Sequence, residues 1–356
     1  KPLKVILKEI ILENVVDLND KVAISQIDKS NCYPSISNLG KQINQAWNET
    51  QALEFPSEFE QAKNIVLCGM GGSAYPAYII KSLFANELKV PFELVNGYNL
   101  PPFVGENTLV LLSSYSGTTE EALSCAKEAR ERNAMVEAVT SGGGLKDLNL
   151  SGYVFKPTFN PSGQPRLGTG YMLTGFMGIL KKLGFLNISD EEVMGAIEFL
   201  ESQLQQMEQL SKELAPELEE KIPVIVSGEH LSGNAHIIRN QFNETAKNFS
   251  AFAYLPELNH HLMEGLVRGS KDLLFLFLKS NLYSEKIQKR LRLTIEVVEK
   301  NNVSTEVIGI LGDTKLSQVF YALGFGGFLT FYLAILYGQD PSVIPWVDYF
   351  KKQLEA

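Results

Sequence analysis

The stretch 64–74 constrains the fold of this chain most, because a short apolar run leads there directly into a cluster of glycines. The run is uncharged and has the length and composition of a strand buried on both faces of a parallel sheet. Gly69, Gly71 and Gly72 follow, and glycines allow positive φ and a close approach of a ligand to the backbone. The helix predicted next would point its free N–H groups at the same place, and Ser73 adds a hydroxyl. This stretch therefore predicts an anion site suited to a phosphate.

A second loop has the composition of a phosphate site. Residues 114–119 read SYSGTT, with five hydroxyl groups and one glycine, and they follow a predicted strand at 108–113. Ligands of a parallel sheet collect at the carboxyl ends of the strands, where both this loop and the glycine loop fall. Serines and threonines also cap helices, but one cap needs only one hydroxyl. We therefore predict a phosphate cradle built from hydroxyls and backbone N–H groups.

Strand and helix patterns alternate along the chain. Strands are predicted at 65–68, 92–96, 108–113, 134–140 and 153–156, and the plan repeats with strands at 222–227, 273–278 and 303–310. Alternation of this kind predicts an α/β fold with two units, each a mainly parallel, doubly wound, Rossmann-like sheet flanked by helices. The second glycine loop, at 228–234, is looser than the first. We expect only the first to hold phosphate.

The length of 356 residues favours two domains. We expect an N-terminal helical lead-in at 1–40, a first domain at 41–188, a helical linker at 189–220, and a second domain with a C-terminal helix at 221–356. Residues 319–338 carry no formal charge and are long enough to span a bilayer. Their four glycines and three tyrosines favour instead a helix buried between the sheet and a partner subunit.

Charge and cysteine content narrow the classes of function. The chain has 41 acidic against 32 basic residues, a net charge of −9 and no basic block, which argues against nucleic acid as a partner. Cys32, Cys68 and Cys125 are an odd, widely spaced set, so we expect a reducing cytoplasm without disulfides or a metal site. The first residues are too interrupted by charge for a signal peptide. Because the chain begins at Lys1, we expect its native start to be missing.

The two loops together resemble a known family. The motif GMGGSA at 69–74 with SYSGTTE at 114–120 is similar to the SIS domain, which binds phosphosugars. The motifs QPR at 164–166, NETAK at 243–247 and ELNH at 257–260 follow in the order found in bifunctional phosphoglucose/phosphomannose isomerases. The resemblance covers nearly the whole chain. It implies two tandem SIS domains, a homodimer with an active site shared between subunits, no metal or nucleotide cofactor, and a place in glycolysis and gluconeogenesis.

The same resemblance implies roles for individual residues. Glu244 is the base, and His260, supplied by the neighbouring subunit, opens the sugar ring. Arg166 stabilises the enediolate, and Lys351 in the C-terminal helix assists near the ring. The phosphate-binding residues are Gly72, Ser73, Ser114, Ser116, Thr118 and Thr119.

The reaction itself asks for side chains of these types. Aldose–ketose interconversion moves a proton between C2 and C1 through a cis-enediol, so it needs one carboxylate that removes and returns the proton, and Glu244 fits. Ring opening moves a proton between O1 and O5, which suits a neutral imidazole of His260 or His261. Arg166 is a permanent charge for the enediolate oxygens. Without the resemblance, a solvated helix carboxylate and a structural histidine are the favoured explanations of Glu244 and His260. A surface salt bridge is the alternative for Arg166, and Lys351 fits the dipole of the last helix.

The chain departs from the family pattern at three places. His261 and Leu262 stand where members usually have Asn-Glu, and Thr118 replaces an asparagine of the serine loop. Members with dual specificity carry Thr before Pro where this chain has Ile344-Pro345. An isoleucine cannot form a hydrogen bond with a sugar hydroxyl, which bears on the mannose activity more than on the glucose activity.

The leading hypothesis is a cytoplasmic homodimer that interconverts glucose 6-phosphate, and mannose 6-phosphate as a further substrate, with fructose 6-phosphate. The first alternative is a catalytically weak SIS protein that binds and senses phosphosugars. The second is a nucleotide-binding oxidoreductase, because residues 69–74 match the dinucleotide fingerprint and Glu93 follows about twenty residues later. That alternative leaves the loop 114–119 without a role.

Overall fold

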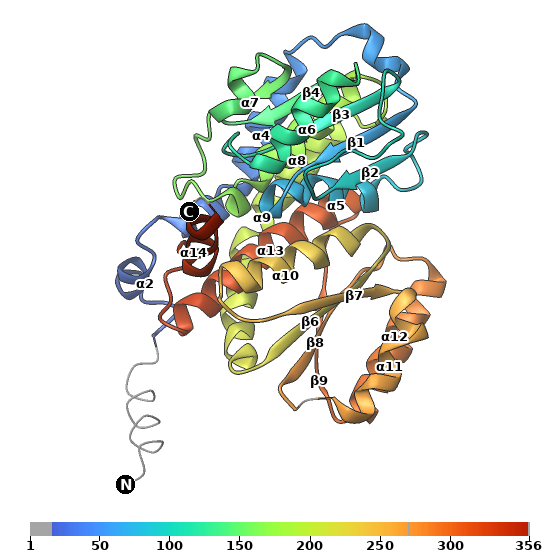
Figure 1. Cartoon of the computed structure of the whole chain (residues 1–356). Coiled ribbons are helices and arrows are strands. Elements are labelled where there is room, and N and C mark those ends of the chain that lie inside the picture. Colours follow the sequence, from blue (N-terminus) through green and yellow to red (C-terminus); the bar gives the residue numbers. More distant parts are fainter. Residues whose placement is uncertain (1–15, 270, 355–356) are drawn as a thin grey trace.

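Two parallel α/β units stacked one on the other make up the computed structural model of this chain (Figure 1). The structure describes residues 16–269 and 271–354. Part of the predicted helical lead-in, residues 1–15, therefore lies outside the described residues. The predicted α/β fold class with two parallel sheets flanked by helices is confirmed.

The first unit has a five-stranded parallel sheet in the order β2-β1-β3-β4-β5. The chain passes from β1 outward to β2, and then crosses to β3 on the other side of β1. The strand order thus reverses between β1 and β3, which makes this the topological switch point where ligands of such sheets bind. Its strands are β1 (Asn64–Cys68), β2 (Phe92–Val95), β3 (Thr108–Ser113), β4 (Met135–Thr140) and β5 (Ser151–Val154).

The second unit repeats this topology with the order β7-β6-β8-β9, and its switch point lies between β6 and β8. Its strands are β6 (Ile222–Gly228), β7 (Ala251–Leu255), β8 (Leu273–Lys279) and β9 (Ser304–Gly309). The sequence did not predict β7. This strand lies at the sheet edge, pairs only with β6 among the described strands and is mostly half-buried, so it lacks a continuous buried apolar run.

Helices cover both faces of the first sheet (Figure 1). Alternate residues of its strands point to opposite faces, so Ile65 and Leu67 join the main core, whereas Val66 and Cys68 join a smaller core under α6. The main core also packs α4 against α8. These helices are α4 (Leu39–Gln51), α5 (Tyr75–Leu83), α6 (Glu120–Glu131), α7 (Gly143–Asp147) and α8 (Thr169–Lys182).

One long apolar helix, α13, runs through the molecule and packs along α9. It contains most of the uncharged stretch 319–338 that raised the question of a membrane span. Among the described residues it is the one helix long and apolar enough to span a bilayer, and 94% of its most apolar window is buried inside the protein. The remaining helices are α2 (Lys21–Ile27), α3 (Cys32–Ser37), α9 (Asp190–Leu214), α10 (Ser232–Glu244), α11 (Leu262–Gly265), α12 (Glu285–Lys300), α13 (Lys315–Leu336) and α14 (Pro345–Leu354).

Helices α5 and α10 join the two units. A Cβ atom on Gly233 would lie 2.5 Å from the carbonyl oxygen of Tyr78, so a glycine is required for the two backbones to meet there. The Tyr78 ring also stacks on His236, with 3.7 Å between centroids and 19° between planes. The start of α5, which follows the glycine loop, is therefore held against the second unit.

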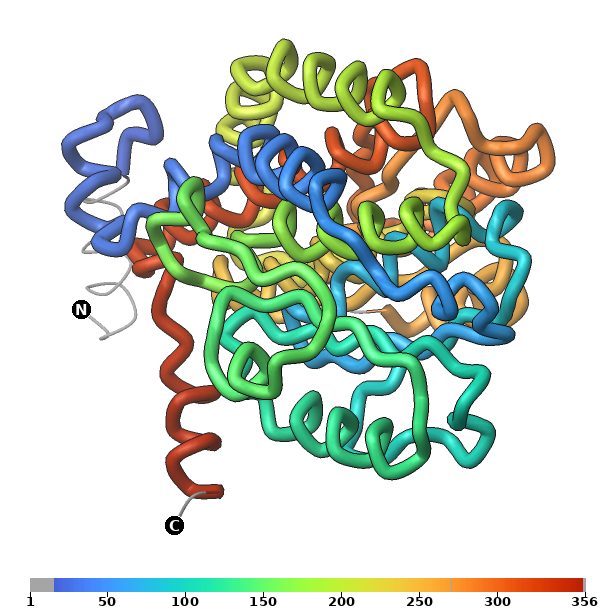
Figure 2. Tube along the Cα trace, turned by 90° about the horizontal axis from the view of Figure 1, so that it is seen from above, coloured from blue at the N-terminus to red at the C-terminus, as the bar shows by residue number. Residues whose placement is uncertain are grey.

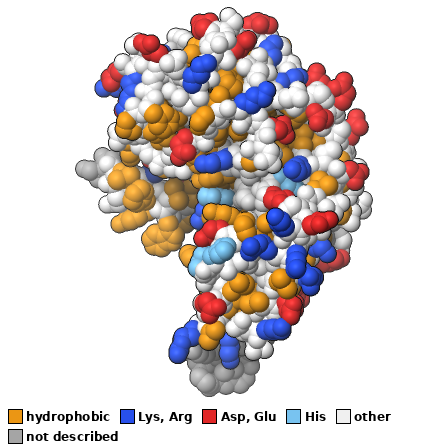
Figure 3. Space-filling view, turned by 90° about the vertical axis from the view of Figure 1, so that its right-hand side faces the viewer, with side chains coloured by type: hydrophobic (Ala, Val, Ile, Leu, Met, Phe, Trp, Pro, Cys, Tyr) orange, Lys and Arg blue, Asp and Glu red, His pale blue; other side chains and the backbone are white. Residues whose placement is uncertain are grey.

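The C-terminal helix α14 extends away from the body of the molecule (Figure 2). None of its residues is buried, and several of them are large and apolar. Trp346 is 81% exposed, and Tyr349, Phe350 and Leu354 are each about 60% exposed. By contrast, acidic and basic side chains are interspersed over the side of the molecule seen in Figure 3.

Candidate active site

The glycine loop after β1 ends in a 3₁₀ turn, Gly71–Ala74, which lies against a second turn, Pro165–Leu167. Gly71 adopts φ +51°, in the left-handed region. A Cβ atom on Gly72 would lie 2.9 Å from the backbone nitrogen of Arg166, so the close approach of the two turns depends on this glycine. The predicted phosphate loop is thereby brought beside Arg166.

The predicted hydroxyl loop follows β3 and holds its hydroxyls in pairs. Ser114 Oγ lies 2.7 Å from Thr119 Oγ1, and Ser116 Oγ lies 2.9 Å from Thr118 Oγ1. Thr119 is the N-cap residue of α6, yet its side chain makes no capping hydrogen bond. Because each pair shares one of its two hydroxyl hydrogens, one hydrogen in each remains for a further acceptor. The hydroxyls are thus not consumed by capping, and their arrangement suits an anion.

Hydrogen bonds tie the two loops together at the switch point of the first sheet. Ser73 is buried, and its hydroxyl accepts a hydrogen bond from the backbone N–H of Tyr115 at 3.0 Å. The hydroxyl of Ser113 donates to the carbonyl oxygen of Ser73. The Tyr115 ring is fixed in turn by Asn160, which donates to its hydroxyl at 2.7 Å. The expected cradle residues therefore form one rigid surface at the carboxyl ends of β1 and β3.

Arg166 is a buried cation, only 2% exposed, between the two units. Four of its five N–H groups are used within the protein. The acceptors are Thr245 Oγ1 at 3.1 Å, Gln164 Oε1 at 2.8 Å, and the carbonyl oxygens of Pro341 at 2.6 Å and Ser342 at 2.9 Å. The fifth N–H is on Nη1, which lies 3.7 Å from Glu244 Oε2. Arg166 is thus not a surface residue, and one donor remains to act at Glu244.

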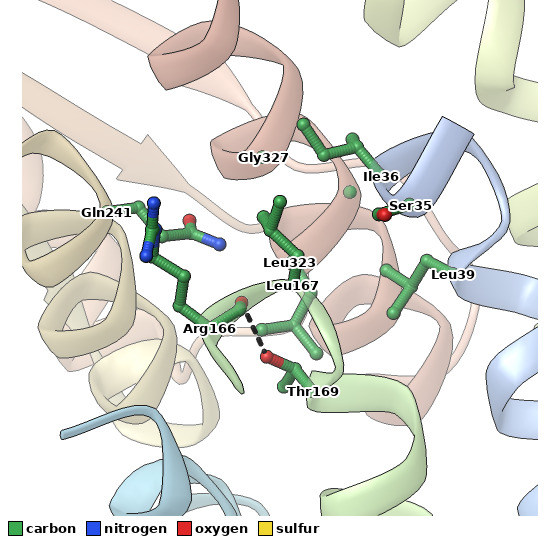
Figure 4. Close-up of a pocket in the computed structure, with 10 residues that line it drawn as sticks. Ser35, Ile36, Leu39, Arg166, Leu167, Thr169, Gln241, Leu323 and Gly327 are labelled. Atoms are coloured by element: carbon green, nitrogen blue, oxygen red, sulfur yellow. Dashed lines mark hydrogen bonds between the residues drawn. The ribbon is translucent and has the colours of Figure 1, made fainter. Parts of the chain in front are cut away.

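A small cavity of about 20 Å³ lies behind Arg166 (Figure 4). Gln241, one turn before Glu244 on α10, lies beside the arginine there, and its side-chain carbonyl oxygen has no hydrogen-bond partner. On the other side, the hydroxyl of Thr169 donates to the backbone carbonyl of Arg166 at 3.1 Å. The cavity has room for about one water molecule, so the arginine is packed on its inner side and faces the site with its outer edge.

Glu244 is the last residue of α10, and its side chain is 31% exposed. Burial raises the pKa of its carboxyl group, while the charges of Arg166, Lys351 and Lys247 act in the opposite direction. A carboxylate with a raised pKa that still faces solvent is suited to accept and return a proton. An open cavity of about 790 Å³ lies beside it, lined also by Lys247, Ile344 and Trp346.

Lys351 lies on α14, close enough to Glu244 for its charge to lower the pKa of the carboxyl group. The structure therefore brings Arg166, Glu244 and Lys351 together, although they come from three distant parts of the sequence.

His260 is the one predicted site residue that the structure places elsewhere in the same chain. It is exposed in the 3₁₀ turn Glu257–His260, beyond the carboxyl end of β7, whereas Glu244 lies before the amino end of that strand. The strand alone separates its two ends by four steps of about 3.3 Å, roughly 13 Å. The neighbouring His261 has its Nε2 atom 3.0 Å from Oε2 of Glu257, at hydrogen-bond distance.

Two residues at this site had no predicted role. Lys247 donates from Nζ to the carbonyl oxygens of Asp340 at 2.5 Å and Thr245 at 3.1 Å, and burial together with the charge of Arg166 lowers its pKa to about 8. Tyr75 is fully buried at the start of α5, and burial together with the Glu244 carboxylate raises the pKa of its hydroxyl. Lys247 lies within the NETAK motif, which was a usable signal, whereas nothing in the sequence pointed to Tyr75.

The residues that the structure describes contain no group of three or more His, Cys, Asp and Glu side chains placed to hold a metal ion. The three cysteines are free and buried.

Two family models match the chain. Residues 58–144 match the SIS domain, and residues 207–354 match the bacterial phospho-glucose isomerase C-terminal SIS domain. The first match contains both predicted phosphate loops, and the second contains Glu244, His260 and Lys351.

Curated relatives align over nearly their whole length. A bifunctional phosphoglucose/phosphomannose isomerase from Thermoplasma volcanium is 31% identical over 309 residues, which is 85% of this chain and 95% of the relative. One from Caldicellulosiruptor bescii is 29% identical over 343 residues, covering 90% and 98%. Among solved structures, a hypothetical protein from Thermus thermophilus superposes with a TM-score of 0.67 at 15% identity, covering 99% of this chain and 94% of its own, which supports the fold alone.

Proposed function

The chain belongs to the bifunctional phosphoglucose/phosphomannose isomerase family, and we propose that it interconverts glucose 6-phosphate and mannose 6-phosphate with fructose 6-phosphate. The observation that carries the proposal is the 3.7 Å approach of Arg166 Nη1 to Glu244 Oε2 beside the glycine loop. A proton acceptor with a raised pKa and a permanent cation are the two groups that an enediolate mechanism needs. The alternative, a phosphosugar sensor without catalysis, leaves this pairing unexplained.

The chemistry begins with the phosphate in the cradle of Gly72, Ser73 and the loop 114–119, which fixes one end of the open-chain sugar. Glu244 then takes the proton from C2 of the aldose, and the electron pair forms the double bond of the cis-enediol. The free N–H of Arg166 Nη1 stabilises the negative charge on the oxygens. Glu244 returns the same proton to C1, while the hydroxyl proton on O2 passes to O1 and C2 becomes the carbonyl carbon of the ketose. Because the phosphate is anchored, both carbons stay within reach of one carboxylate.

We assign ring opening to His260 of a second copy of the chain in a homodimer. His260 of the same chain lies beyond the far end of β7, so it does not complete the site that contains Glu244. The exposed apolar side chains of α14 support a partner that covers this helix, because monomers rarely expose so many large apolar residues together. The three free, buried cysteines support a reducing compartment, and we place the enzyme in cytoplasmic hexose phosphate metabolism.

The direct test is Glu244→Gln, which keeps the shape of the side chain but removes its ability to accept a proton. In a coupled assay with fructose 6-phosphate, we expect kcat to fall by about 10³-fold, because general-base catalysis contributes roughly 10² to 10⁴-fold. The KM should change little, since the phosphate cradle is untouched. Glu213→Gln, on the exposed face of α9, serves as the matched control and should retain native activity. Native turnover in Glu244→Gln would refute the mechanism.

Mixed dimers test the shared site. We expect Glu244→Gln and His260→Ala to be inactive or slow as separate proteins. In a hybrid of the two, one site has two altered residues, while the other combines a native Glu244 with a native His260. If subunits assort at random, co-refolding should therefore restore about a quarter of the native activity. Absence of any recovery, with hybrids verified by mass, would show that each site draws both residues from one chain.

A further inference from the structure

Three consecutive backbone carbonyls, those of residues 340–342, are each held by a cation. Arg166 Nη2 donates to Pro341 at 2.6 Å and to Ser342 at 2.9 Å, and Lys247 Nζ donates to Asp340 at 2.5 Å. The Asp340 carboxylate does not pair with either cation at hydrogen-bond distance. It accepts instead from the backbone N–H and the hydroxyl of Ser342, at 2.8 and 2.6 Å. The Asp340 side chain thus stabilises the turn, and the backbone carbonyl oxygens of residues 340–342 accept the hydrogen bonds from the two cations.

This turn is the connection between α13 and α14. Helix α13 is buried along almost its whole length, whereas α14 has no buried residue with which to fix its own position. Ile344, at the cavity beside Glu244, and Lys351 both follow the turn. Their placement relative to the Glu244 carboxylate therefore depends on how firmly residues 340–342 are held.

The backbone conformation of Lys247 is one that disfavours lysine, which indicates that the lysine side chain has a role at this position. It adopts φ +55°, a left-handed conformation that is unfavourable for a lysine by roughly 1 kcal/mol. It lies just after α10, where the N–H of Asn248 closes the helix end by donating to Phe242 O at 3.0 Å. Glycine or asparagine is the usual residue in such a helix-ending position. A lysine in this position is less stable in its backbone conformation than glycine, but it places an ammonium group at the turn 340–342.

We propose that Lys247 is a positioning residue for the reaction: its ammonium group fixes residues 340–342 and so holds Ile344 and Lys351 at Glu244. The inference rests on the proposed isomerase function, and it adds a residue that does not itself touch the substrate. The hydrogen bonds of Lys247 and Arg166 to the carbonyls of residues 340–342 form a clamp on this turn. Arg166 also lies 3.7 Å from Glu244, so its replacement would alter the site directly. The charge of Lys247 acts on the Glu244 carboxyl group as well, and Lys247→Arg, which keeps that charge, is the control for this effect.

The ionisation of Lys247 supplies a second signature. The charged groups and thiol that act on it are Arg166, Asp340, Cys32 and Glu244. With its pKa lowered to about 8, the ammonium loses its proton as the pH rises through 8, and the strong charge-assisted hydrogen bonds to the carbonyls become ordinary ones. The clamp should therefore weaken on the alkaline side of neutrality, and kcat should fall there.

The kinetic test compares Lys247→Met, Lys247→Arg and Lys247→Gly. We expect Lys247→Met to lower kcat by about 10- to 100-fold with a smaller change in KM, because small misplacements of catalytic groups have effects of that size. Lys247→Arg should restore most of the activity and remove the loss of kcat near pH 8, since arginine stays charged. Lys247→Gly should relax the backbone and hold its melting temperature, yet be as slow as Lys247→Met. A glycine variant as active as the native enzyme would overturn the proposal.

The structural test does not depend on activity. Hydrogen exchange of backbone amides in the peptide 340–347 should be about tenfold faster in Lys247→Met than in the native protein, because the turn has lost one of its two cations. The matched control is Lys182→Met, since Lys182 also donates to a backbone carbonyl, that of Gln51, but at the far end of α8. Unchanged exchange in Lys247→Met would refute the clamp even if the native protein proved not to be an isomerase. Faster exchange in Lys247→Met, together with a native protein that shows no isomerase activity, would uphold the clamp and refute the proposed function.

Discussion

The two units use the same topological position in different ways. In the first unit, the loops after β1 and β3 present serine and threonine hydroxyls that bond only to one another or to the backbone. In the second unit, the loop after β6 carries Glu229, whose carboxylate accepts from the backbone N–H of Ser284 at 3.1 Å and from its hydroxyl at 2.6 Å. Ser284 is the N-cap residue of α12, the counterpart of Thr119 before α6. An anion of the protein thus fills the second switch point.

This difference shows why one of two similar loops is the candidate phosphate site. Both switch points combine a turn after the first strand with a helix N-terminus after the third, a geometry that favours negative charge. The second unit satisfies that preference with its own carboxylate, whereas the first has no acidic side chain in the corresponding glycine loop. The second unit contributes instead the far end of its helix α10, where Glu244 lies.

The proposed difference between the two units would be wrong if the first switch point did not bind phosphate. The double variant Ser73→Ala, Ser114→Ala should lower kcat/KM by roughly 10³-fold, because each hydrogen bond to a charged group contributes about 1.5 to 3 kcal/mol. Most of the loss should appear in KM, measured with fructose 6-phosphate, and in weaker competition by inorganic phosphate.

The matched control is Glu229→Gln at the second switch point. It should lower the melting temperature because an amide is a weaker acceptor than the carboxylate for Ser284, but it should leave KM unchanged. A large KM increase in this variant, or a native KM in the double serine variant, would contradict the assignment of phosphate binding to the first unit alone.

The two sheets should also differ in their response to pH. Glu137 on β4 is fully buried, and burial raises the pKa of its carboxyl group to about 7. Since this pKa lies above the value of an exposed glutamate, the stability that the protonated group contributes is complete at low pH and is lost as the pH rises through about 7. Glu137→Gln should therefore remove about 2 kcal/mol of the decline in unfolding free energy between pH 5 and pH 8.

Urea unfolding at the two pH values measures this effect, with Glu306→Gln as the control. Glu306 is a partly exposed carboxylate at a comparable place on β9 of the second sheet, so its replacement should not alter the pH dependence. An unchanged pH dependence in Glu137→Gln would show that Glu137 is not the group responsible.

The smallest expected effect concerns the sugar end of the substrate, which we propose that the second unit contacts. Ile344 lines the cavity beside Glu244, and Ile344→Thr introduces a hydroxyl able to bind a sugar oxygen. We expect the ratio of mannose 6-phosphate to glucose 6-phosphate activity to rise by about 3- to 10-fold, the range of one neutral hydrogen bond. Inhibition by inorganic phosphate should not change, and Ile344→Val should behave as native. An unaltered ratio would mean that residue 344 does not contact the sugar hydroxyls that distinguish the two substrates.

Most of the fold was predictable because its strands are continuous buried apolar runs. Strand β3 begins and ends where the sequence indicates, and the apolar stretch that lies mostly in α13 proved to be a buried helix. Strand β7 was missed because an edge strand that is half exposed has no comparable pattern. The exposure of α14 could not be predicted either. Large apolar residues such as Trp346 and Phe350 in a final helix usually indicate packing against the same chain, whereas both are exposed here.

The candidate site was predictable in its residue types but not in its connections. The sequence could propose Arg166 and Glu244 separately, with a surface salt bridge as the alternative role of the arginine. That four of its donors are used inside the protein, two of them at the carbonyls of Pro341 and Ser342, follows only from the tertiary contacts. Lys247 belongs to the NETAK motif, but its role was not predicted, because its partners are backbone atoms, which leave no trace in side-chain patterns.

The contact between Gly233 and the backbone of Tyr78 limits how this protein can be recombined. Exchange of the second unit with that of a relative would succeed only if the donor also lacks a side chain at position 233, since any Cβ there meets a carbonyl oxygen at 2.5 Å. The same contact packs the backbones of α5 and α10 directly against each other, which opposes sliding of one helix across the other. We therefore expect ligand entry and release to involve the loops and α14 rather than the junction between the two units.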